Sequence, residues 1–175
     1  VVSQSDGQTR DYTLVRRSVE IPIVTYEQVG DAGYIDCSSF GESTPAVVGQ
    51  ALEELDDDVA LWVMDLRSNP GGTDRSATLT AGQFVGSAIM VYFRDANDIY
   101  YYEAPPAGYG DLTDKPLVIL TSPYSASGSE LFAAAIRDHG AGVAVGQRTY
   151  GKGVAQVVFD AENRPDLFDG DCLKV

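Results

Sequence analysis

The chain has 175 residues, which is enough for one domain with a sizeable hydrophobic core. Its composition is that of an ordinary globular protein, with 44% hydrophobic and 22% charged residues. The formal net charge of −14 argues against nucleic acid or an anionic membrane surface as the main partner. The sequence also lacks a run of about 18 apolar residues, the length that a membrane-spanning helix requires.

The first part of the chain alternates predicted strands with predicted helices. Residues 12–24 and 33–40 are rich in β-branched and aromatic residues and are predicted as strands. Residues 43–55 begin with a Ser/Thr cap and a proline and then place apolar residues at helical spacing, so a helix is predicted there. Residues 60–67 form a nearly continuous apolar run, which is typical of a strand buried on both faces. This strand runs into the turn sequence S-N-P-G-G.

The later part of the chain repeats this alternation. Two further helices are predicted at 73–86 and at 128–139, the second ended by Gly140. Further strands are predicted at 88–94, 99–104, 116–122, 141–147 and 154–160, followed by a loop and a final short strand. The pattern indicates an α/β domain in which helices pack on a sheet. Because ligand sites in such domains form at the carboxyl ends of strands, the turns after 60–67 and 116–122 are the places to look for chemistry.

The turn after the second of these strands contains three serines. Residues 121–130 read T-S-P-Y-S-A-S-G-S-E, with Ser125, Ser127 and Ser129 separated by small residues. Ser127 would stand at the start of a helix, where unpaired backbone N–H groups and the helix dipole stabilise a developing oxyanion. A nucleophile is therefore one interpretation of Ser127. The alternative is that Ser125 or Ser127 serves only as a helix N-cap.

A nucleophilic serine needs a base, and the only histidine is badly placed for that role. His139 would lie roughly 16–18 Å from Ser127, at the far end of the same helix. Of the three lysines, Lys152 lies between Gly151 and Gly153 just before an apolar stretch, whereas Lys115 and Lys174 have no such setting. Burial lowers the pKa of a lysine and makes its neutral amine available as a general base. The alternative is a surface lysine in a β-turn.

Three other features have interpretations that involve no catalysis. Cys37 and Cys172 lack metal-ligand spacing, so two buried thiols are predicted, with a single disulfide as the alternative. The acidic run 55–58 is interpreted as a solvated helix end, because its consecutive carboxylates do not converge on one metal. Residues 100–110 are interpreted as a strand and an exposed loop, with lining of a substrate groove as the alternative.

The serine and lysine segments together resemble the signature of the carboxyl-terminal processing peptidases, also called tail-specific proteases. That family carries a sequence close to S-A-S-A-S-E, an alanine-rich helix, a short strand and then T-x-G-K-G-x-x-Q. This chain has S-A-S-G-S-E, L-F-A-A-A-I-R-D-H-G-A-G-V-A-V-G-Q and T-Y-G-K-G-V-A-Q, with Ser127 and Lys152 separated by 25 positions as in the family. The order of upstream segments is also similar, so the resemblance covers about residues 12–160.

The resemblance implies a Ser/Lys dyad in a peptidase core of the crotonase/ClpP-like α/β type. It makes Ser127 the nucleophile and Lys152 the general base, with Gln156 orienting the lysine. The oxyanion hole would consist of the Gly128 amide and an amide of the N-P-G-G turn, with Gly72 favoured over Gly71. Asn69 and Pro70 would shape that turn, Glu130 matches the family pattern without an assigned role, and no metal or cofactor is expected.

The resemblance also implies how the chain is organised and where it acts. Residues 1–25 would be the end of an upstream PDZ-like module and its linker, and residues 26–175 a peptidase core that is cut short at its C-terminus. The expected partners are unfolded or C-terminally exposed protein substrates outside the cytoplasm, and not nucleic acid. An oligomer, or a membrane tether outside this chain, is compatible with the family.

Two other functions compete with an endopeptidase. The chain could be an inactive domain of the same fold that binds peptides or small apolar ligands, or a crotonase-like enzyme that acts on acyl thioesters. Neither alternative needs Ser127, Lys152, Gln156 and both glycine-rich segments at the same time. The endopeptidase is therefore the favoured prediction.

Overall fold

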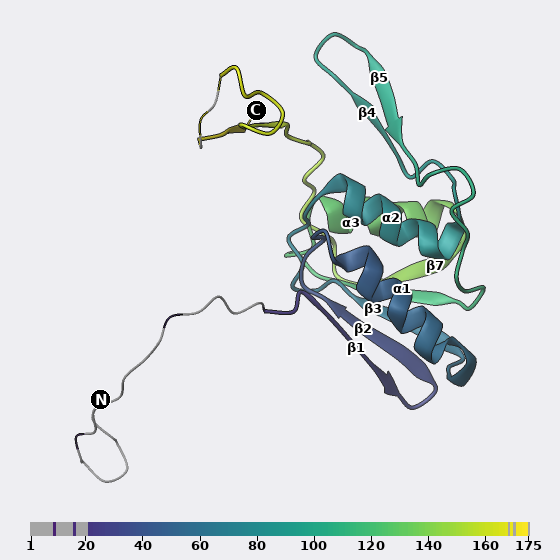
Figure 1. Ribbon diagram of the computed structural model, residues 1–175. Coiled ribbons are helices and arrows are strands. Elements are labelled where there is room, and N and C mark those ends of the chain that lie inside the picture. The colour runs from purple at the N-terminus through teal and green to yellow at the C-terminus, as the bar shows by residue number, and fades with distance from the viewer. Residues whose placement is uncertain (1–8, 10–15, 17–20, 168, 170, 175) are drawn as a thin grey trace.

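The computed structural model describes residues 9, 16, 21–167, 169 and 171–174. Its centre is a five-stranded sheet in which β1 is antiparallel to β2 and the other neighbouring strands are parallel (Figure 1). The order across the sheet is β1 (Val24–Val29), β2 (Ala32–Cys37), β3 (Leu61–Asp65), β6 (Leu117–Thr121) and β7 (Gly142–Gly146). The strands of this sheet therefore follow one another across it in the same order as along the chain.

Three α-helices connect the parallel strands of this sheet. Helix α1 (Thr44–Leu55) joins β2 to β3, α2 (Asp74–Val85) follows β3, and α3 (Gly128–Asp138) joins β6 to β7. Every crossover advances across the sheet in the same direction, and such crossovers are almost always right-handed. The helices therefore cover the same face of the sheet (Figure 1). A short 3-10 helix, η1 (Asp56–Asp58), ends the first connection.

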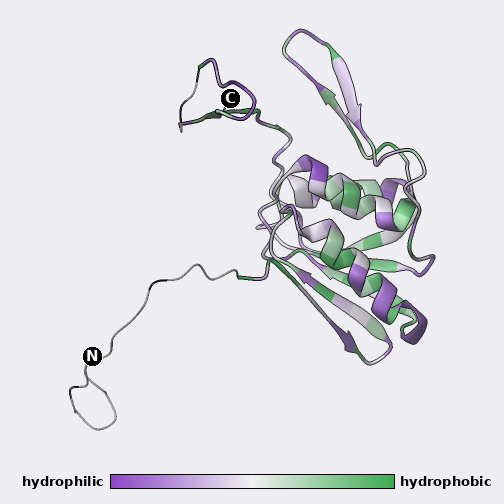
Figure 2. Ribbon diagram, viewed as in Figure 1, coloured by the Kyte–Doolittle hydropathy of each residue, from purple (hydrophilic) through white to green (hydrophobic). Residues whose placement is uncertain are grey.

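The hydrophobic core lies between the helices and one face of the sheet. Ile35, Trp62, Met64 and Ile119 alternate along the central strands and are completely buried. Phe132 of α3 packs against them and contacts Phe40 with a ring-centroid distance of 5.6 Å. Figure 2 shows the hydrophobic residues concentrated on the strands and on parts of the helices, with hydrophilic residues along the outer side of α1.

The second face of the sheet corrects the prediction that residues 60–67 are buried on both faces. Leu61 and Val63 point away from the helices and are only partly buried, and the same holds for Val118 and Leu120. No helix of the described residues covers that face. The apolar run therefore correctly indicates a strand in the interior of the sheet, but the side chains on the face away from the helices are less buried than the run suggests.

Two small hairpins stand apart from the central sheet. Strands β4 (Val91–Arg94) and β5 (Tyr100–Glu103) pair antiparallel and project away from the helices, and β8 (Val158–Phe159) pairs with β9 (Leu173–Lys174) (Figure 1). None of the helices in the described ranges is both long and apolar enough to cross a membrane.

Most predicted elements are confirmed with small changes in their ends. The three helices and the strands at 33–40, 60–67, 88–94, 99–104, 116–122 and 141–147 are found. The strand predicted over 12–24 lies mostly outside the described residues, and the prediction missed β1, which begins at Val24. Only Val158–Phe159 of the predicted strand 154–160 is a strand. Both cysteines are free, but Cys172 is exposed, so the prediction of two buried thiols is correct only for Cys37.

Candidate active site

Ser125, Ser127 and Ser129 follow β6 but have different surroundings. Ser125 and Ser129 are completely buried, and their hydroxyl groups donate to backbone carbonyls. Ser125 Oγ is 2.7 Å from the Leu66 oxygen, and Ser129 Oγ is 2.9 Å from the Asn69 oxygen. Ser127 is only partly buried and borders two cavities. Of the three serines, Ser127 is thus the one that can reach a bound molecule.

Ser127 lies in a tight turn with a backbone conformation that favours glycine. Its φ and ψ are 53° and −115°, and a hydrogen bond of 3.0 Å from the Ser129 amide to the Ala126 carbonyl closes the turn. These values are those of the first central residue of a type II′ turn. A non-glycine residue in such a conformation costs about 1–3 kcal/mol and is found mainly at functional sites. The turn sets Ser127 directly before the first residue of α3, where the helix amides are unpaired.

The side chain of Glu130 holds the Ser127 turn against the segment that contains Lys152. Its Oε2 atom accepts hydrogen bonds of 2.9 Å from the amides of Ser127 and Lys152. Its Oε1 atom accepts a bond of 2.6 Å from the amide of Gly151. Partial burial acts to raise the pKa of Glu130, but hydrogen bonds from the Thr149 side chain and these amides outweigh it and lower the pKa. A charged Glu130 therefore fixes the two segments relative to each other.

Two adjoining cavities lie where these segments meet. The first has a volume of about 240 Å³ and the second about 480 Å³, and Ser127, Lys152 and Asp74 line both. Gly72 and Gln156 line the second cavity. The fold therefore gathers Ser127, Lys152, Gln156 and Gly72 from three distant parts of the sequence around one space.

The glycines of the N-P-G-G turn lie against the Ser127 turn. A Cβ atom on Gly71 would approach Ser127 Cβ to 2.8 Å, and one on Gly128 would lie 3.4 Å from the Gly72 nitrogen. The Gly71 amide already donates to Asn69 Oδ1 at 2.8 Å, so it is not available for an oxyanion, which corrects its inclusion among the predicted donors. The amides of Gly72 and Gly128 have no acceptor among the described residues.

Asn69 connects this turn to the core and to the serine segment. It is completely buried, and its Nδ2 atom donates to the Cys37 carbonyl at 2.9 Å. The Asn69 carbonyl accepts from the Ala126 amide at 3.2 Å as well as from Ser129. Asn69 thus shapes the turn, as predicted. Burial raises the pKa of the neighbouring Cys37 thiol to about 12, so this thiol stays protonated.

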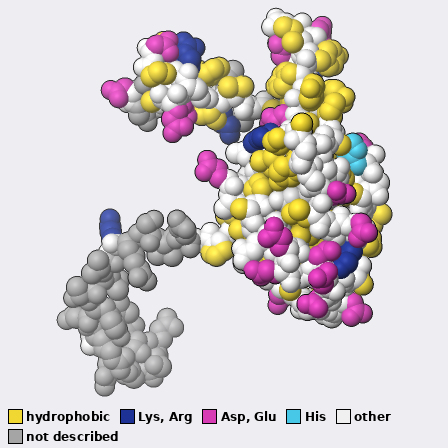
Figure 3. Space-filling model, turned by 45° about the vertical axis from the view of Figure 1, so that its right-hand side comes forward, with side chains coloured by type: hydrophobic (Ala, Val, Ile, Leu, Met, Phe, Trp, Pro, Cys, Tyr) yellow, Lys and Arg dark blue, Asp and Glu magenta, His cyan; other side chains and the backbone are white. Residues whose placement is uncertain are grey.

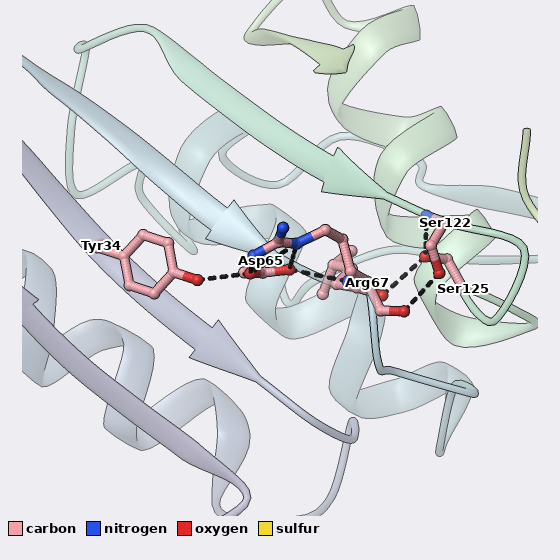
Figure 4. Close-up of polar contacts among 6 residues, drawn as sticks. Tyr34, Asp65, Arg67, Ser122 and Ser125 are labelled. Atoms are coloured by element: carbon pink, nitrogen blue, oxygen red, sulfur yellow. Dashed lines mark hydrogen bonds and ion pairs between the residues drawn. The ribbon is translucent and has the colours of Figure 1, made fainter. Parts of the chain in front are cut away.

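A second polar network supports the carboxyl ends of β2, β3 and β6 (Figure 4). The Arg67 guanidinium forms an ion pair of 2.6 Å with Asp65, which also accepts a hydrogen bond from the Tyr34 hydroxyl. The Arg67 carbonyl accepts from the Ser122 hydroxyl, and the Ser125 hydroxyl accepts from the Ser122 amide at 3.0 Å. This network joins the segment before the N-P-G-G turn to the segment before Ser127.

Lys152, the predicted base, lines the same two cavities as Ser127, the predicted nucleophile, but the two side chains are not hydrogen-bonded to each other. Lys152 is partly buried and Gln156 is exposed. Within the described part of the chain, the Lys152 amine forms no hydrogen bond with Ser127 or Gln156. Catalytic hydrogen bonds are often long without substrate and tighten when it binds. His139 is exposed at the end of α3, with its Nε2 atom 2.9 Å from the Ile89 carbonyl, and lines neither cavity.

Sequence reasoning missed several residues of the site. Glu130 had no assigned role, although a glutamate three residues after Ser127 is the pattern of a capping box. Asp74 was not singled out, and nothing in its local sequence marks it. Val91 and Phe93 of β4 line the first cavity. In segment 100–110, for which lining of a groove was the alternative interpretation, Glu103 lines the second cavity. No group of three metal-ligating side chains converges anywhere in the described ranges.

Comparisons with known proteins agree on one family. The family model described as "Peptidase family S41" matches residues 31–173. The chain is 33% identical to the "Carboxy-terminal-processing protease" of Bartonella bacilliformis, over 85% of this chain and 36% of that protein. It is 32% identical to the "Carboxyl-terminal-processing peptidase 3, chloroplastic" of Arabidopsis thaliana, over 91% of this chain and 31% of that protein.

Solved structures give the same result. The structure of "Photosystem II D1 C-terminal processing protease" superimposes with a TM-score of 0.70 and 30% identity, over 85% of this chain and 42% of that one. A lipoprotein from Streptococcus agalactiae shares the fold, with a TM-score of 0.69 at 15% identity. The chain spans about a third of the length of the curated relatives that it matches.

Proposed function

Since this chain belongs to peptidase family S41, we propose that it forms the catalytic core of a serine endopeptidase. The observation that carries this proposal is the position of Ser127. It lies in a glycine-type turn at the start of α3, on the wall of a cavity that Lys152 and Gly72 share. A serine that only capped the helix would need neither this backbone conformation nor a cavity.

In the proposed first step, Ser127 Oγ attacks the carbonyl carbon of a peptide bond while its proton moves to the Lys152 amine. An oxygen–carbon bond forms, and the carbonyl oxygen takes up the negative charge. The Gly72 and Gly128 amides would donate to this oxygen, because they lie close together and have no other acceptor in the described structure. Gln156 would orient Lys152 from the wall of the second cavity.

In the second step the carbon–nitrogen bond breaks, and the protonated Lys152 gives its proton to the leaving amine. The acyl group remains on Ser127. Water then attacks this ester while Lys152 accepts its proton. The bond between the acyl carbon and Ser127 Oγ breaks, Lys152 returns the proton to Oγ, and the new carboxyl terminus is released. Glu130 takes no proton in this scheme, because it holds the backbone of Ser127 and Lys152 in place.

The test of this proposal is the cleavage of an unfolded protein substrate with an apolar C-terminus. We expect Ser127→Ala and Lys152→Ala each to lower kcat by about a thousandfold or more, because the residues of a catalytic dyad act as a unit. The matched controls are Ser87→Ala and Lys115→Ala. Ser87 is exposed and Lys115 pairs with Asp56, so both controls should cleave at the rate of the unchanged protein.

Two outcomes would contradict the proposal. Full activity of the Ser127→Ala variant would show that another group is the nucleophile. An unchanged protein that binds several unfolded substrates and cleaves none of them would favour the inactive peptide-binding domain instead. Circular dichroism of each variant distinguishes lost chemistry from lost folding.

We further propose where this core acts and what accompanies it. Its substrates would be unfolded or C-terminally exposed proteins outside the cytoplasm, as the resemblance to the carboxyl-terminal processing peptidases implies. Residues 1–23, most of which lie outside the described residues, would be the end of a PDZ-like module that recognises a substrate C-terminus. The boundary predicted at residue 25 falls within β1, which belongs to the core sheet. The sheet with its helices on one face supports a core of the crotonase/ClpP-like type.

A further inference from the structure

The first cavity has mainly apolar walls and a lining carboxylate that no described residue pairs with. Its volume of about 240 Å³ suits a single large side chain of a bound substrate. The apolar side chains that line it are Val91, Phe93, Leu131, Val154 and Ala155. Figure 3 shows hydrophobic side chains on the projecting hairpin and also on the part of the body below it. Such walls favour an aliphatic or aromatic stem.

This carboxylate belongs to Asp74, the first residue of α2. Asp74 is partly buried at the cavity wall and has no hydrogen bond or ion pair to its carboxylate among the residues described. Burial raises the pKa of Asp74, and the charge of Lys152 acts in the opposite direction. A partly buried carboxylate without a partner is costly, so a cation that enters the cavity would be stabilised there.

The other charged groups at this cavity are already engaged or belong to the proposed chemistry. The carboxylate of Glu130 accepts from the amides of Ser127, Gly151 and Lys152. Lys152 must be neutral when it accepts a proton from Ser127, and then it does not compensate Asp74. The carboxylate of Asp74 is thus the negatively charged group at this cavity that remains available to pair with a positively charged substrate side chain.

We propose, building on the endopeptidase function above, that this cavity receives the substrate side chain on the acyl side of the cleaved bond and that Asp74 selects lysine or arginine there. The acyl-side residue stays attached to Ser127 after the first step, so its side chain must fit in the space beside Ser127. Lysine and arginine bury an aliphatic stem and keep a charged tip, which matches the apolar walls and the carboxylate. An uncharged side chain of equal length would leave Asp74 covered and unpaired.

A structural role for Asp74 makes a different prediction. An acidic residue in the first turn of a helix stabilises it through the helix dipole. If that were the only role, replacing Asp74 would lower the stability of the protein and slow the cleavage of all substrates equally. A change in substrate preference therefore separates the two roles.

The experiment measures kcat/KM of the purified protein on quenched fluorescent peptides that differ at one position. Lysine, norleucine or glutamate stands on the acyl side of the cleaved bond, and a fourth peptide carries lysine on the amine side. We expect lysine on the acyl side to be preferred over norleucine by roughly tenfold or more, the effect of one compensated charge. Asp74→Asn should remove this preference, because it slows the lysine peptide far more than the norleucine peptide. Asp57→Asn, an exposed change on η1, should keep the preference and so exclude an effect of overall charge.

The outcomes separate this inference from the proposed function. The role of Asp74 is overturned if cleavage after norleucine is equal to or faster than cleavage after lysine, or if lysine is preferred on the amine side. It is also overturned if the Asp74→Asn variant keeps the preference for lysine. In each case the endopeptidase function still stands. Failure to cleave any peptide or unfolded protein would overturn the endopeptidase function and this inference with it. If Asp74→Asn folds poorly, Asp74→Ser gives the same comparison of peptides.

Discussion

Glu130 contacts two segments that are far apart in the sequence but must meet for a Ser/Lys dyad to work. Glu130→Gln keeps the size of the side chain but replaces one oxygen with an NH₂ group, which cannot accept from an amide. At least one of its three backbone hydrogen bonds is then lost. A hydrogen bond to a charged group contributes about 1.5–3 kcal/mol, so we expect kcat to fall by roughly ten- to a hundredfold.

The measurement compares kcat with amide hydrogen exchange at Gly151 and Lys152. Exchange at both amides should become faster in Glu130→Gln, whereas KM should change little because Glu130 does not bind substrate in this scheme. The control is Glu53→Gln, an exposed glutamate on α1. Unchanged exchange together with a lower kcat would argue that Glu130 acts in the chemistry and not through position.

At the scale of single residues, the sequence predicts what depends on local spacing. Ser127 and Lys152 could be proposed because two motifs stand 25 positions apart in a family arrangement. The choice between Gly71 and Gly72 could not be made firmly, because it depends on the Asn69 side chain that occupies the Gly71 amide. The placement of Asp74 beside Lys152 depends on how α2 meets the 151–155 segment, which no local pattern encodes.

At the scale of elements, Asn69 links the turn after β3 to the start of α3. Asn69→Ala removes three interactions of a completely buried side chain and leaves the Cys37 carbonyl and the Gly71 amide without these partners. We expect the free energy of unfolding to fall by about 2–4 kcal/mol. Urea denaturation followed by fluorescence of the single tryptophan, Trp62, measures this change.

Asn69→Asp serves as the matched variant. The aspartate keeps an acceptor for the Gly71 amide but loses the donor to the Cys37 carbonyl, and it adds a charge in a buried position. It should therefore be no more stable than Asn69→Ala. If both variants unfold at the same urea concentration as the unchanged protein, the contacts of Asn69 do not hold this junction.

The elements themselves were predictable where one pattern dominates. Helix α3 shows buried residues at helical spacing and ends near a glycine with φ of +73°, so both its existence and its end could be predicted. Strand β1 was missed because, after Val24, it is mostly exposed and lacks an apolar alternation. The sequence of residues 154–157 is typical of a strand. In the structure these residues are exposed, some of them line a cavity, and they have no partner strand among the described residues.

At the scale of the whole molecule, acidic side chains in buried networks make stability depend on pH. Asp65 is nearly buried, and burial would raise its pKa, but hydrogen bonds from Arg67 and Tyr34 outweigh this effect and lower the pKa. Burial of Asp56 is likewise outweighed by hydrogen bonds from Thr113 and Trp62 and by Lys115, so its pKa is also lowered. The pKa of Glu130 is lowered as well. Each of these carboxylates is charged in the folded protein at a pH where the unfolded chain already binds a proton.

The sign of the pH dependence follows from this difference. The stabilisation is complete above the pKa values of the unfolded chain, about 3.9 for aspartate and 4.3 for glutamate, and is lost as the pH falls through the lower values of the folded state. The net charge of −14 acts in the opposite direction, because protonation of ordinary surface carboxylates relieves repulsion. We expect nearly constant stability from pH 7 to 5 and a steep fall below about pH 4.

Urea denaturation at intervals between pH 7 and 3 tests this expectation, with Asp65→Asn as the informative variant. Asp65→Asn should be less stable at pH 7, because Arg67 and Tyr34 lose their charged partner, and its stability should fall less steeply in acid. Asp57→Asn, which is exposed on η1, should follow the unchanged protein at every pH. A constant free energy of unfolding down to pH 3 would mean that solvent already screens these networks and that packing alone holds the ends of β2, β3 and β6 together.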